Sequence, residues 1–450
     1  MSLIINFSAL LLEQDDYGLL TDLYQLTMAA CYVGEGLDQR RASFELFVRR
    51  LPEGFGYLIA AGLASALNYL EAFRFSSEQL AALKATDIFV AAPAEFWSLL
   101  ETGRFSGDVW AVPEGTAVFA HEPILRVEAP LWQAQIVETY LLNAINYQTL
   151  IATRAARLRD VAGPEATLLE FGTRRAFSPQ AALWAARAAL AGGLDATSNV
   201  LAALKLGRKP TGTMAHALVM AISALEGGER ESFEAFHRYF PGAPLLIDTY
   251  DTVAAAQQLG QNPPQSLAGV RIDSGNLVAL SKQVRQALPH VPIFASGDLD
   301  EREILRLKQA GACIDGYGLG TKLVTGTPVN GVYKLVDIDD IPVMKESQGK
   351  LTYPGRKQIF RTATGDQLGL AEETPTANAA KLLTPVMQRG ERILTNESLD
   401  VIQERATQSV AQLPSTVRDV NNPIVPQAQI STALQKLTDC TRRTQVATVS

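Results

Sequence analysis

The stretch from Leu245 to Asp298 contains three apolar runs that each end in an aspartate: Leu245-Leu-Ile-Asp248, Gly269-Val-Arg-Ile-Asp273 and Ile293-Phe-Ala-Ser-Gly-Asp298. Successive aspartates are 25 residues apart, and each run precedes a segment with helical periodicity. Apolar runs that alternate with helical segments predict βα units and a parallel sheet. Units of one length that each end in a carboxylate favour a TIM-like barrel with its site at the carboxyl ends of the strands. The alternative is that each aspartate only caps the helix that follows it.

The sequence on both sides extends this pattern. Further apolar runs are Leu168–Phe171, Gly212–Val219 and Ile314–Leu319, and a long helix is predicted from Leu131 towards Leu158. Together with the three aspartate-ended runs, they predict the strands of one irregular barrel.

Outside this region the pattern changes, which predicts three parts. Residues 1–130 mix helical and extended patterns, and Asp22-Leu-Tyr-Gln25 has the spacing of a capping box that opens a helix. Residues 131–340 form the predicted barrel domain. Residues 341–450 are more polar and form a C-terminal segment that we expect to pack back on the N-terminal domain.

Composition limits the classes of function. The 450 residues carry a formal charge of −7. The chain therefore lacks the excess of basic residues that is typical of proteins that bind nucleic acids or anionic membrane surfaces. The three cysteines lie far apart and form no CxxC pair, which argues against a disulfide framework or a zinc site. The apolar segment Leu58–Leu70 is too short to span a bilayer. We expect a cytoplasmic protein that binds small ligands.

Two clusters place charged groups at predicted strand ends. In Phe171-Gly-Thr-Arg-Arg175, a guanidinium such as that of Arg174 suits bidentate capture of a carboxylate or phosphate. In Arg271-Ile-Asp-Ser-Gly275, strand alternation sends Arg271 and Asp273 to the same side, where they can bind an anion and a sugar diol. The alternatives are a solvated loop for the first cluster and a buried ion pair for the second.

Two further clusters suit phosphate chemistry. Gly212-Thr-Met-Ala-His216 carries one of only four histidines, at a position that suits a general base, a metal ligand or a phosphate acceptor. The competing explanation is a core histidine bonded to a carbonyl. Ser296-Gly-Asp298 and Gly316-Tyr-Gly-Leu-Gly-Thr321 are glycine-rich turns that can cradle a phosphate with backbone N–H groups.

Taken together, these segments resemble the nicotinate phosphoribosyltransferase family. The residues that carry the resemblance are Thr21–Met28, Phe171–Arg175, Gly212–His216, Ile247–Asp251, Arg271–Gly275 and Gly318–Thr321. It runs from about residue 17 to about 360, whereas the tail beyond 370 matches poorly. That tail lacks the cysteine cluster of some relatives, so we expect no protein-bound metal.

The resemblance implies a fold and a reaction. The fold is an irregular barrel of the type II phosphoribosyltransferases, joined to a sandwich-like domain built from the N-terminal part and returning C-terminal chain. The reaction joins nicotinate to phosphoribosyl pyrophosphate, giving nicotinate mononucleotide and pyrophosphate for NAD biosynthesis. ATP hydrolysis is coupled through a phosphohistidine, and Mg²⁺ accompanies ATP and pyrophosphate. The family works as a homodimer with shared active sites.

The resemblance also implies roles for single residues. Phe171 and Tyr24 sandwich the pyridine ring, Tyr24 coming from the other subunit, and Arg271 faces the ring carboxylate. Asp273 stands near the ribose hydroxyls, where it stabilises oxocarbenium character.

The remaining roles concern phosphate groups. Gly297, Gly320 and Thr321 match the cradle of the 5′-phosphate. His216 matches the phosphorylated residue, with Thr213 beside it and Asp248 placed to orient its ring. Asp298 contacts ribose or metal.

Four other functions compete with this one. Nicotinamide phosphoribosyltransferase shares the architecture but carries an aspartate where this chain has Thr197, which favours the acid as substrate. Quinolinate phosphoribosyltransferase would need further cations for a diacid. Lys322 after a strand end allows a Schiff-base lyase, and a catalytically inactive paralogue that senses the nucleotide is the last alternative. The presence of every motif residue argues against the inactive paralogue.

Overall fold

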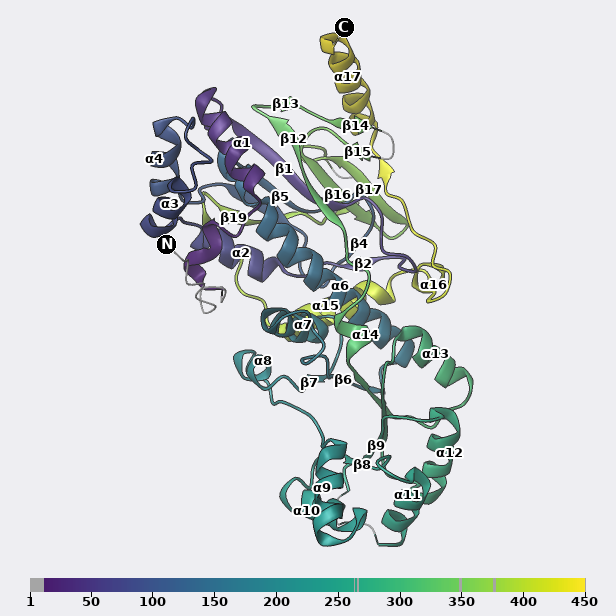
Figure 1. The fold of residues 1–450 in the computed structure, drawn as a ribbon. Helices are drawn as coiled ribbons and strands as arrows, with labels where there is room; N and C mark the ends of the chain where they lie inside the picture. The colour runs from purple at the N-terminus through teal and green to yellow at the C-terminus, as the bar shows by residue number, and fades with distance from the viewer. Residues whose placement is uncertain (1–11, 263, 265–266, 348–349, 375–377, 450) are drawn as a thin grey trace. The chain divides into compact units, whose positions relative to one another are not determined.

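The computed structural model describes residues 12–262, 264, 267–347, 350–374 and 378–449. The chain forms two compact units, each assembled from separate segments (Figure 1). The first unit consists of Met1–Tyr147, Val329–Glu397 and Val425–Ser450, and the second of Gln148–Pro328 and Ser398–Ile424. The long helix α6 (Glu138–Ala162) contributes residues to both units.

The first unit contains a seven-stranded sheet whose strands come from distant parts of the chain. Its order is β13-β12-β1-β5-β3-β19-β20. Strand β1 (Arg41–Val48) therefore lies between β5 (Pro123–Pro130) and β12 (Gly331–Ile338) and is antiparallel to both. Strand β3 (Asp108–Ala111) pairs with β5 and with β19 (Thr384–Gln388). N-terminal and C-terminal segments thus share one sheet.

The other elements of this unit are the two edge strands of that sheet, β13 and β20, the strands of smaller sheets, and the helices. The strands are β2 (Leu58–Ile59), β4 (Ala117–Val118), β13 (Ile341–Pro342), β14 (Lys345–Ser347), β15 (Lys350–Thr352), β16 (Lys357–Thr362), β17 (Gly365–Leu370), β18 (Ala380–Lys381), β20 (Glu391–Arg392) and β21 (Gln429–Ile430). The helices are α1 (Leu23–Gly34), α2 (Leu63–Ala72), α3 (Ser77–Lys84), α4 (Ala94–Thr102), α5 (Leu131–Ile136) and α17 (Thr432–Val449). Helices α5 and α6 together cover the predicted long helix, with a break at Val137.

The second unit is built on a parallel six-stranded sheet of order β7-β6-β11-β10-β9-β8. The strands are β6 (Thr167–Glu170), β7 (Ala196–Thr197), β8 (Leu245–Leu246), β9 (Val270–Ile272), β10 (Ile293–Ser296) and β11 (Gly316–Leu319). The helices are α7 (Pro179–Ala191), α8 (Val200–Lys205), α9 (His216–Glu226), α10 (Glu229–Tyr239), α11 (Thr252–Gln261), α12 (Leu277–Ala287), α13 (Glu301–Gln309), α14 (Thr321–Val324), α15 (Leu399–Ala411) and α16 (Ser415–Arg418). The prediction of alternating strands and helices around the three aspartates is confirmed.

The predicted barrel is not closed. Within the described residues, the strand ladder ends at β7 on one side and β8 on the other, because the predicted strand Gly212–Val219 does not form. Thr211 N donates to Thr197 O (3.0 Å), and then Thr213 Oγ1 donates to Pro244 O, just before β8. One hydrogen bond to the Thr197 side and one to the Pro244 side thus hold this segment, and helix α9 already begins at His216. An apolar run flanked by glycine does not by itself distinguish a strand from such a connection.

The three periodic aspartates are not the helix caps. The side chains that cap α11, α12 and α13 belong to Asp251, Asn276 and Asp300, which accept hydrogen bonds from backbone N–H groups in the first turn. Asp248, Asp273 and Asp298 precede these caps and lie at the carboxyl ends of β8, β9 and β10. The capping alternative is therefore wrong for all three.

Within the part of the chain that the structure describes, none of the helices combines the length and apolar content that crossing a bilayer requires.

Candidate active site

The carboxyl edge of the second unit's sheet collects most of the predicted site residues. Strand register places Arg271 opposite Phe294, and Ser296 opposite Gly318. These residues share one face of the sheet, whereas Val270, Ile272, Ile293 and Ala295 are buried on the other. Asp273 continues the polar face just beyond β9. Alternation on three short strands thus separates a polar face from an apolar core.

Arg271 and Asp273 form the centre of a hydrogen-bonded network. The guanidinium of Arg271 donates from Nε to Ser296 Oγ (2.9 Å), from Nη1 to Met214 O (3.3 Å) and from Nη2 to Asp273 Oδ1 (3.1 Å). Ser296 Oγ also donates to Asp273 Oδ1. A guanidinium has five N–H donors, so Arg271 keeps two for a ligand. The site therefore combines a largely buried cation with a partly exposed carboxylate.

Opposing effects act on the charge of Asp273. Burial disfavours the carboxylate, but the hydrogen bond from Ser296 and the charge of Arg271 outweigh burial, so the pKa of Asp273 lies below its usual value. The charge of His216 acts in the same direction, which places the two side chains within electrostatic range. Asp273 is therefore ionised at neutral pH.

Asp248 holds the backbone of the neighbouring strand end. Its Oδ2 accepts hydrogen bonds from Asp273 N (2.8 Å) and from Ser274 Oγ (2.7 Å). The predicted contact between Asp248 and His216 is not formed, because Nδ1 of His216 lies 3.1 Å from Thr249 Oγ1 instead. Thr249 was missed in the sequence, although it directly follows Asp248.

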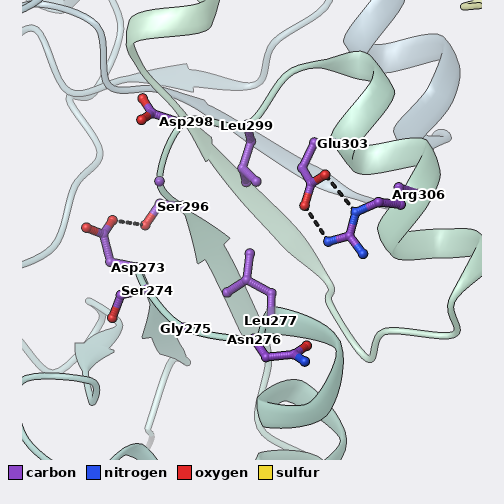
Figure 2. Close-up of a pocket in the computed structure, with 11 residues that line it drawn as sticks. Asp273, Ser274, Gly275, Asn276, Leu277, Ser296, Asp298, Leu299, Glu303 and Arg306 are labelled. Atoms are coloured by element: carbon purple, nitrogen blue, oxygen red, sulfur yellow. Dashed lines mark hydrogen bonds and ion pairs between the residues drawn. The ribbon is translucent and has the colours of Figure 1, made fainter.

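A polar cavity of about 460 Å³ opens beside Asp273 (Figure 2). Figure 2 shows Asp273 hydrogen-bonded to Ser296 on one side and the paired Glu303 and Arg306 of α13 on the other. The cavity is lined by Asp273, Ser274, Gly275, Asn276, Leu277, Ser296, Gly297, Asp298, Leu299, Glu303 and Arg306. The structure thus brings the candidate residues Asp273, Gly297 and Asp298 to one cavity and adds Glu303 and Arg306, which no sequence motif indicated.

Two glycines allow close approaches at this edge. Gly297 has φ of +97°, and a Cβ there would meet Asp273 O at 2.4 Å. A Cβ on Gly318 would meet the ring of Phe171 at 2.7 Å. The Arg271 guanidinium carbon lies 5.9 Å from the centre of the same ring. Glycine is therefore required at both positions by packing.

Phe171 and Arg271 also border a small void on the sheet face. The void measures about 10 Å³ and is lined by Leu169, Phe171, Gly212, Thr213, Pro244, Arg271, Phe294 and Gly318. Such a volume holds roughly one water molecule. An aromatic ring does not fit this void at its present size.

Of the remaining predicted site residues, some lie at the carboxyl edge of the second unit's sheet and others lie elsewhere in the chain. Gly320 and Thr321 follow β11, where α14 begins. Arg174 is exposed in the turn between β6 and α7. Tyr24 belongs to the first unit, on α1, with 46% of its surface exposed. The predicted capping box before it is wrong, because Gln25 donates to Glu138 (2.8 Å).

The structure shows the surroundings of two residues on which alternative functions depend: Lys322 for the Schiff-base lyase and Thr197 for the choice between nicotinate and nicotinamide. Lys322 is half exposed, and its Nζ lies 3.4 Å from Asp300, so it lacks the apolar pocket that activates a Schiff-base lysine. Thr197 is buried and donates its hydroxyl to Glu170, whose pKa is raised by burial. No sequence motif indicated this buried Glu170–Thr197 pair.

The described residues contain no preformed cluster of side chains that could by itself hold a metal ion. Among the residues that the structure describes, no three His, Cys, Asp or Glu side chains converge on one metal position. Mg²⁺ commonly uses only one or two carboxylates and completes its shell with water and substrate phosphates. Asp298, which lines the cavity, fits the role of one such ligand.

Comparison with known families decides the assignment. The family models described as the nicotinate phosphoribosyltransferase N-terminal domain, family and C-terminal domain match residues 19–146, 166–295 and 357–438. The chain belongs to the nicotinate phosphoribosyltransferase family. The expectation that the tail beyond residue 370 matches this family poorly is wrong, since the C-terminal model covers it.

Individual relatives agree with the family assignment. A nicotinate phosphoribosyltransferase of Mycobacterium tuberculosis is 41% identical over 90% of this chain and 89% of its own length. The Bacillus subtilis nicotinate phosphoribosyltransferase is 42% identical over 80% of this chain and 78% of its own length. The crystal structure of human nicotinic acid phosphoribosyltransferase matches with a TM-score of 0.81 at 31% identity, over 93% of this chain and 99% of that chain. Similarity at this level extends over both units.

Proposed function

We propose that the chain transfers the phosphoribosyl group of phosphoribosyl pyrophosphate to nicotinate, forming nicotinate mononucleotide and pyrophosphate for NAD biosynthesis. The single observation that carries the proposal is the Arg271–Asp273 pair at the polar cavity, within a chain of this family. A guanidinium with two remaining donors suits the ring carboxylate, and an ionised aspartate suits the ribose. The proposal includes a cytoplasmic location, which the odd number of cysteines supports.

The chemical step follows from these charges. The C1′–O bond to pyrophosphate breaks and pyrophosphate leaves with the electron pair, while the pyridine nitrogen forms the new C1′–N bond. Positive charge develops on the ribose, and the carboxylate of Asp273 is placed to stabilise it. The pyridine nitrogen is already nucleophilic, so the reaction requires no general base. Mg²⁺ bound to the phosphates, with Asp298 as a protein ligand, would neutralise the leaving group.

The remaining residues bind and orient the substrates. Phe171 supplies one face for the pyridine ring, beside Arg271. Gly297 is exposed and lines the cavity, and together with Gly320 and Thr321 it would hold the 5′-phosphate. Arg174, exposed after β6, is a further anion-binding group.

ATP coupling is assigned to His216. This residue begins α9, hydrogen-bonds Thr249 and lies within electrostatic range of Asp273. Nucleophilic attack by the free ring nitrogen on the γ-phosphorus would break the bond to ADP and leave a phosphohistidine. The added negative charge would then act directly at the Asp273 cavity.

One assay tests the proposed reaction. Pyrophosphate release is measured with nicotinate, nicotinamide and quinolinate in parallel, with and without ATP. We expect nicotinate to be the preferred substrate and ATP to stimulate the reaction. Equal or faster turnover of nicotinamide would assign the chain to the alternative substrate.

Arg271→Ala is expected to lower kcat/KM for nicotinate by roughly 10- to 100-fold, since a charge-assisted hydrogen bond contributes about 1.5–3 kcal/mol. Nicotinamide should lose proportionately less, because it lacks the carboxylate. The measurement is steady-state kinetics with both substrates, and thermal unfolding controls for the loss of the Ser296 and Met214 contacts. Equal losses for both substrates would show that Arg271 is structural.

Tyr24 is expected to act in the site of the partner subunit of a homodimer. Its exposure on α1, beside the exposed Leu23, leaves the ring accessible. Tyr24→Ala should raise the KM for nicotinate, and mixing it with His216→Ala subunits, which lack stimulation by ATP, should restore part of the ATP-stimulated activity at nicotinate concentrations below the raised KM. Absence of recovery after verified subunit exchange would contradict shared sites.

A further inference from the structure

Glu229 lies at the carboxyl edge of the sheet but belongs to none of the motifs described above. It is the first residue of α10, the helix that leads into β8. A helix that precedes a parallel strand runs opposite to that strand, so its first residue lies near the strand's carboxyl end. The topology therefore places Glu229 beside the segment Asp248–Asp251.

Two buried carboxylate oxygens in this corner have no hydrogen-bond partner among the described residues. They are Oε1 of Glu229 and Oδ1 of Asp248. The other oxygen of Asp248, Oδ2, already accepts hydrogen bonds from Asp273 N and Ser274 Oγ. Buried polar atoms are rarely left without partners, and each exception calls for an explanation.

Among the described residues, the charges that act on Glu229 are those of two carboxylates. They come from Asp248 and Asp251 on the segment between β8 and α11, and no described side chain of the adjoining α9 contributes a compensating charge. Burial, then Asp248, then Asp251 raise the pKa of Glu229 to about 7. Both protonation states are therefore populated at neutral pH, and only the neutral acid can donate a hydrogen bond.

We propose that Glu229 is a positioning residue that acts on the Asp273 cavity through Asp248. In the neutral state, its carboxyl O–H turns towards Asp248 Oδ1 and donates to it. Asp248 is then fixed at both oxygens, and it holds the backbone of Asp273 and the side chain of Ser274 in place. In the ionised state, the two carboxylates repel each other, and this support for Asp273 is lost. The inference rests on the proposed role of Asp273 in the transfer reaction.

The test compares pH profiles of kcat between pH 5.5 and 8.5. The wild-type kcat should fall by about fivefold as pH rises through 7, the effect expected for loss of one hydrogen bond. Glu229→Gln keeps a donor but cannot ionise, so its kcat should stay near the acidic wild-type value throughout. Glu229→Ala should be about fivefold slower at all pH values, with an unchanged KM for nicotinate.

Glu231→Gln is the matched control, since Glu231 is exposed in the same helical turn and its change in charge is identical. This variant should keep the wild-type profile. A second readout is thermal stability. A raised carboxyl pKa favours the fold at low pH and loses that effect as pH rises through the folded-state value. Glu229→Gln should therefore gain melting temperature over wild type at pH 8 and not at pH 5.

Three outcomes would overturn the inference. They are a Glu229→Gln profile that falls like the wild type, a Glu229→Ala variant with full activity at all pH values, and a wild-type midpoint that moves with MgCl₂ concentration. The last would assign the two carboxylates to cation binding. A carboxyl NMR titration of Glu229 in the full chain separates this inference from the proposed function. If Asp273→Asn kept full activity while Glu229 titrated near 7, the catalytic role of Asp273 would fail, and the contact between Glu229 and Asp248 would stand.

Discussion

Asp273→Asn is expected to lower kcat by about 10²- to 10³-fold, the usual effect of removing one preorganised electrostatic group from a reacting centre. Asparagine keeps the size and the hydrogen-bonding oxygen of aspartate but removes its charge. The carboxylate is held by Ser296 and Arg271 at the wall of the cavity, and its pKa is lowered despite burial. The loss should therefore appear in kcat, measured with saturating nicotinate and phosphoribosyl pyrophosphate, and less in the KM for nicotinate.

A second variant distinguishes the loss of the Asp273 charge from the loss of local structure. Ser296→Ala removes one hydrogen bond to Asp273 and one from Arg271 but leaves both charges in place. It should cost less than about tenfold, since a neutral hydrogen bond contributes roughly 1 kcal/mol. If Asp273→Asn retained a third or more of the wild-type kcat, charge stabilisation by this residue would be disproved.

His216→Ala is expected to abolish nicotinate-dependent ATP hydrolysis and the stimulation of transfer by ATP. A slow ATP-independent transfer should survive, because the pyridine nitrogen needs no base and the Arg271–Asp273 pair is intact. In the wild type, γ-labelled ATP should place acid-labile, base-stable label on the peptide that contains His216. The measurements are coupled ADP release, pyrophosphate release and peptide mapping.

His290→Ala is the control for this prediction, since His290 is exposed beyond the end of α12. It should keep full coupling. A labelled peptide elsewhere in the chain, or ATP stimulation that persists in His216→Ala, would show that the phosphoryl group is carried by another residue.

The strands of the second unit could be predicted from the sequence where burial in the fold produces the apolar pattern directly. Strands β8, β9 and β10 are apolar because they are buried, and their polar continuations Asp248, Asp273 and Asp298 emerge at the same edge. The segment after Gly212 was misread because its apolar residues do not distinguish strand from connection. Its hydrogen bonds go to Thr197, from the backbone of Thr211, and to Pro244, from the side chain of Thr213, and both partners are distant in sequence.

Side-chain partners were predicted less well than positions. The family resemblance implied that Asp248 orients the ring of His216, but rotamers and loop geometry decide which side chain reaches the ring, and that side chain is Thr249. Glu229 and Arg306 were missed because they lie on amphipathic helices, where a charged residue in the first or second turn is the norm. Only the packing of a helix beside a strand end distinguishes them from solvent-exposed charges.

The position of β1 in the first unit's sheet has a consequence for synthesis of the chain. Its partner β12 is translated about 280 residues later, so one edge of β1 has no strand to pair with until then. At about 5–20 residues per second, this interval lasts roughly 15–60 seconds on the ribosome. An unpaired apolar edge is a template for aggregation. The seven-stranded sheet is therefore completed only late in synthesis, and the edge of β1 that β12 covers stays open until then.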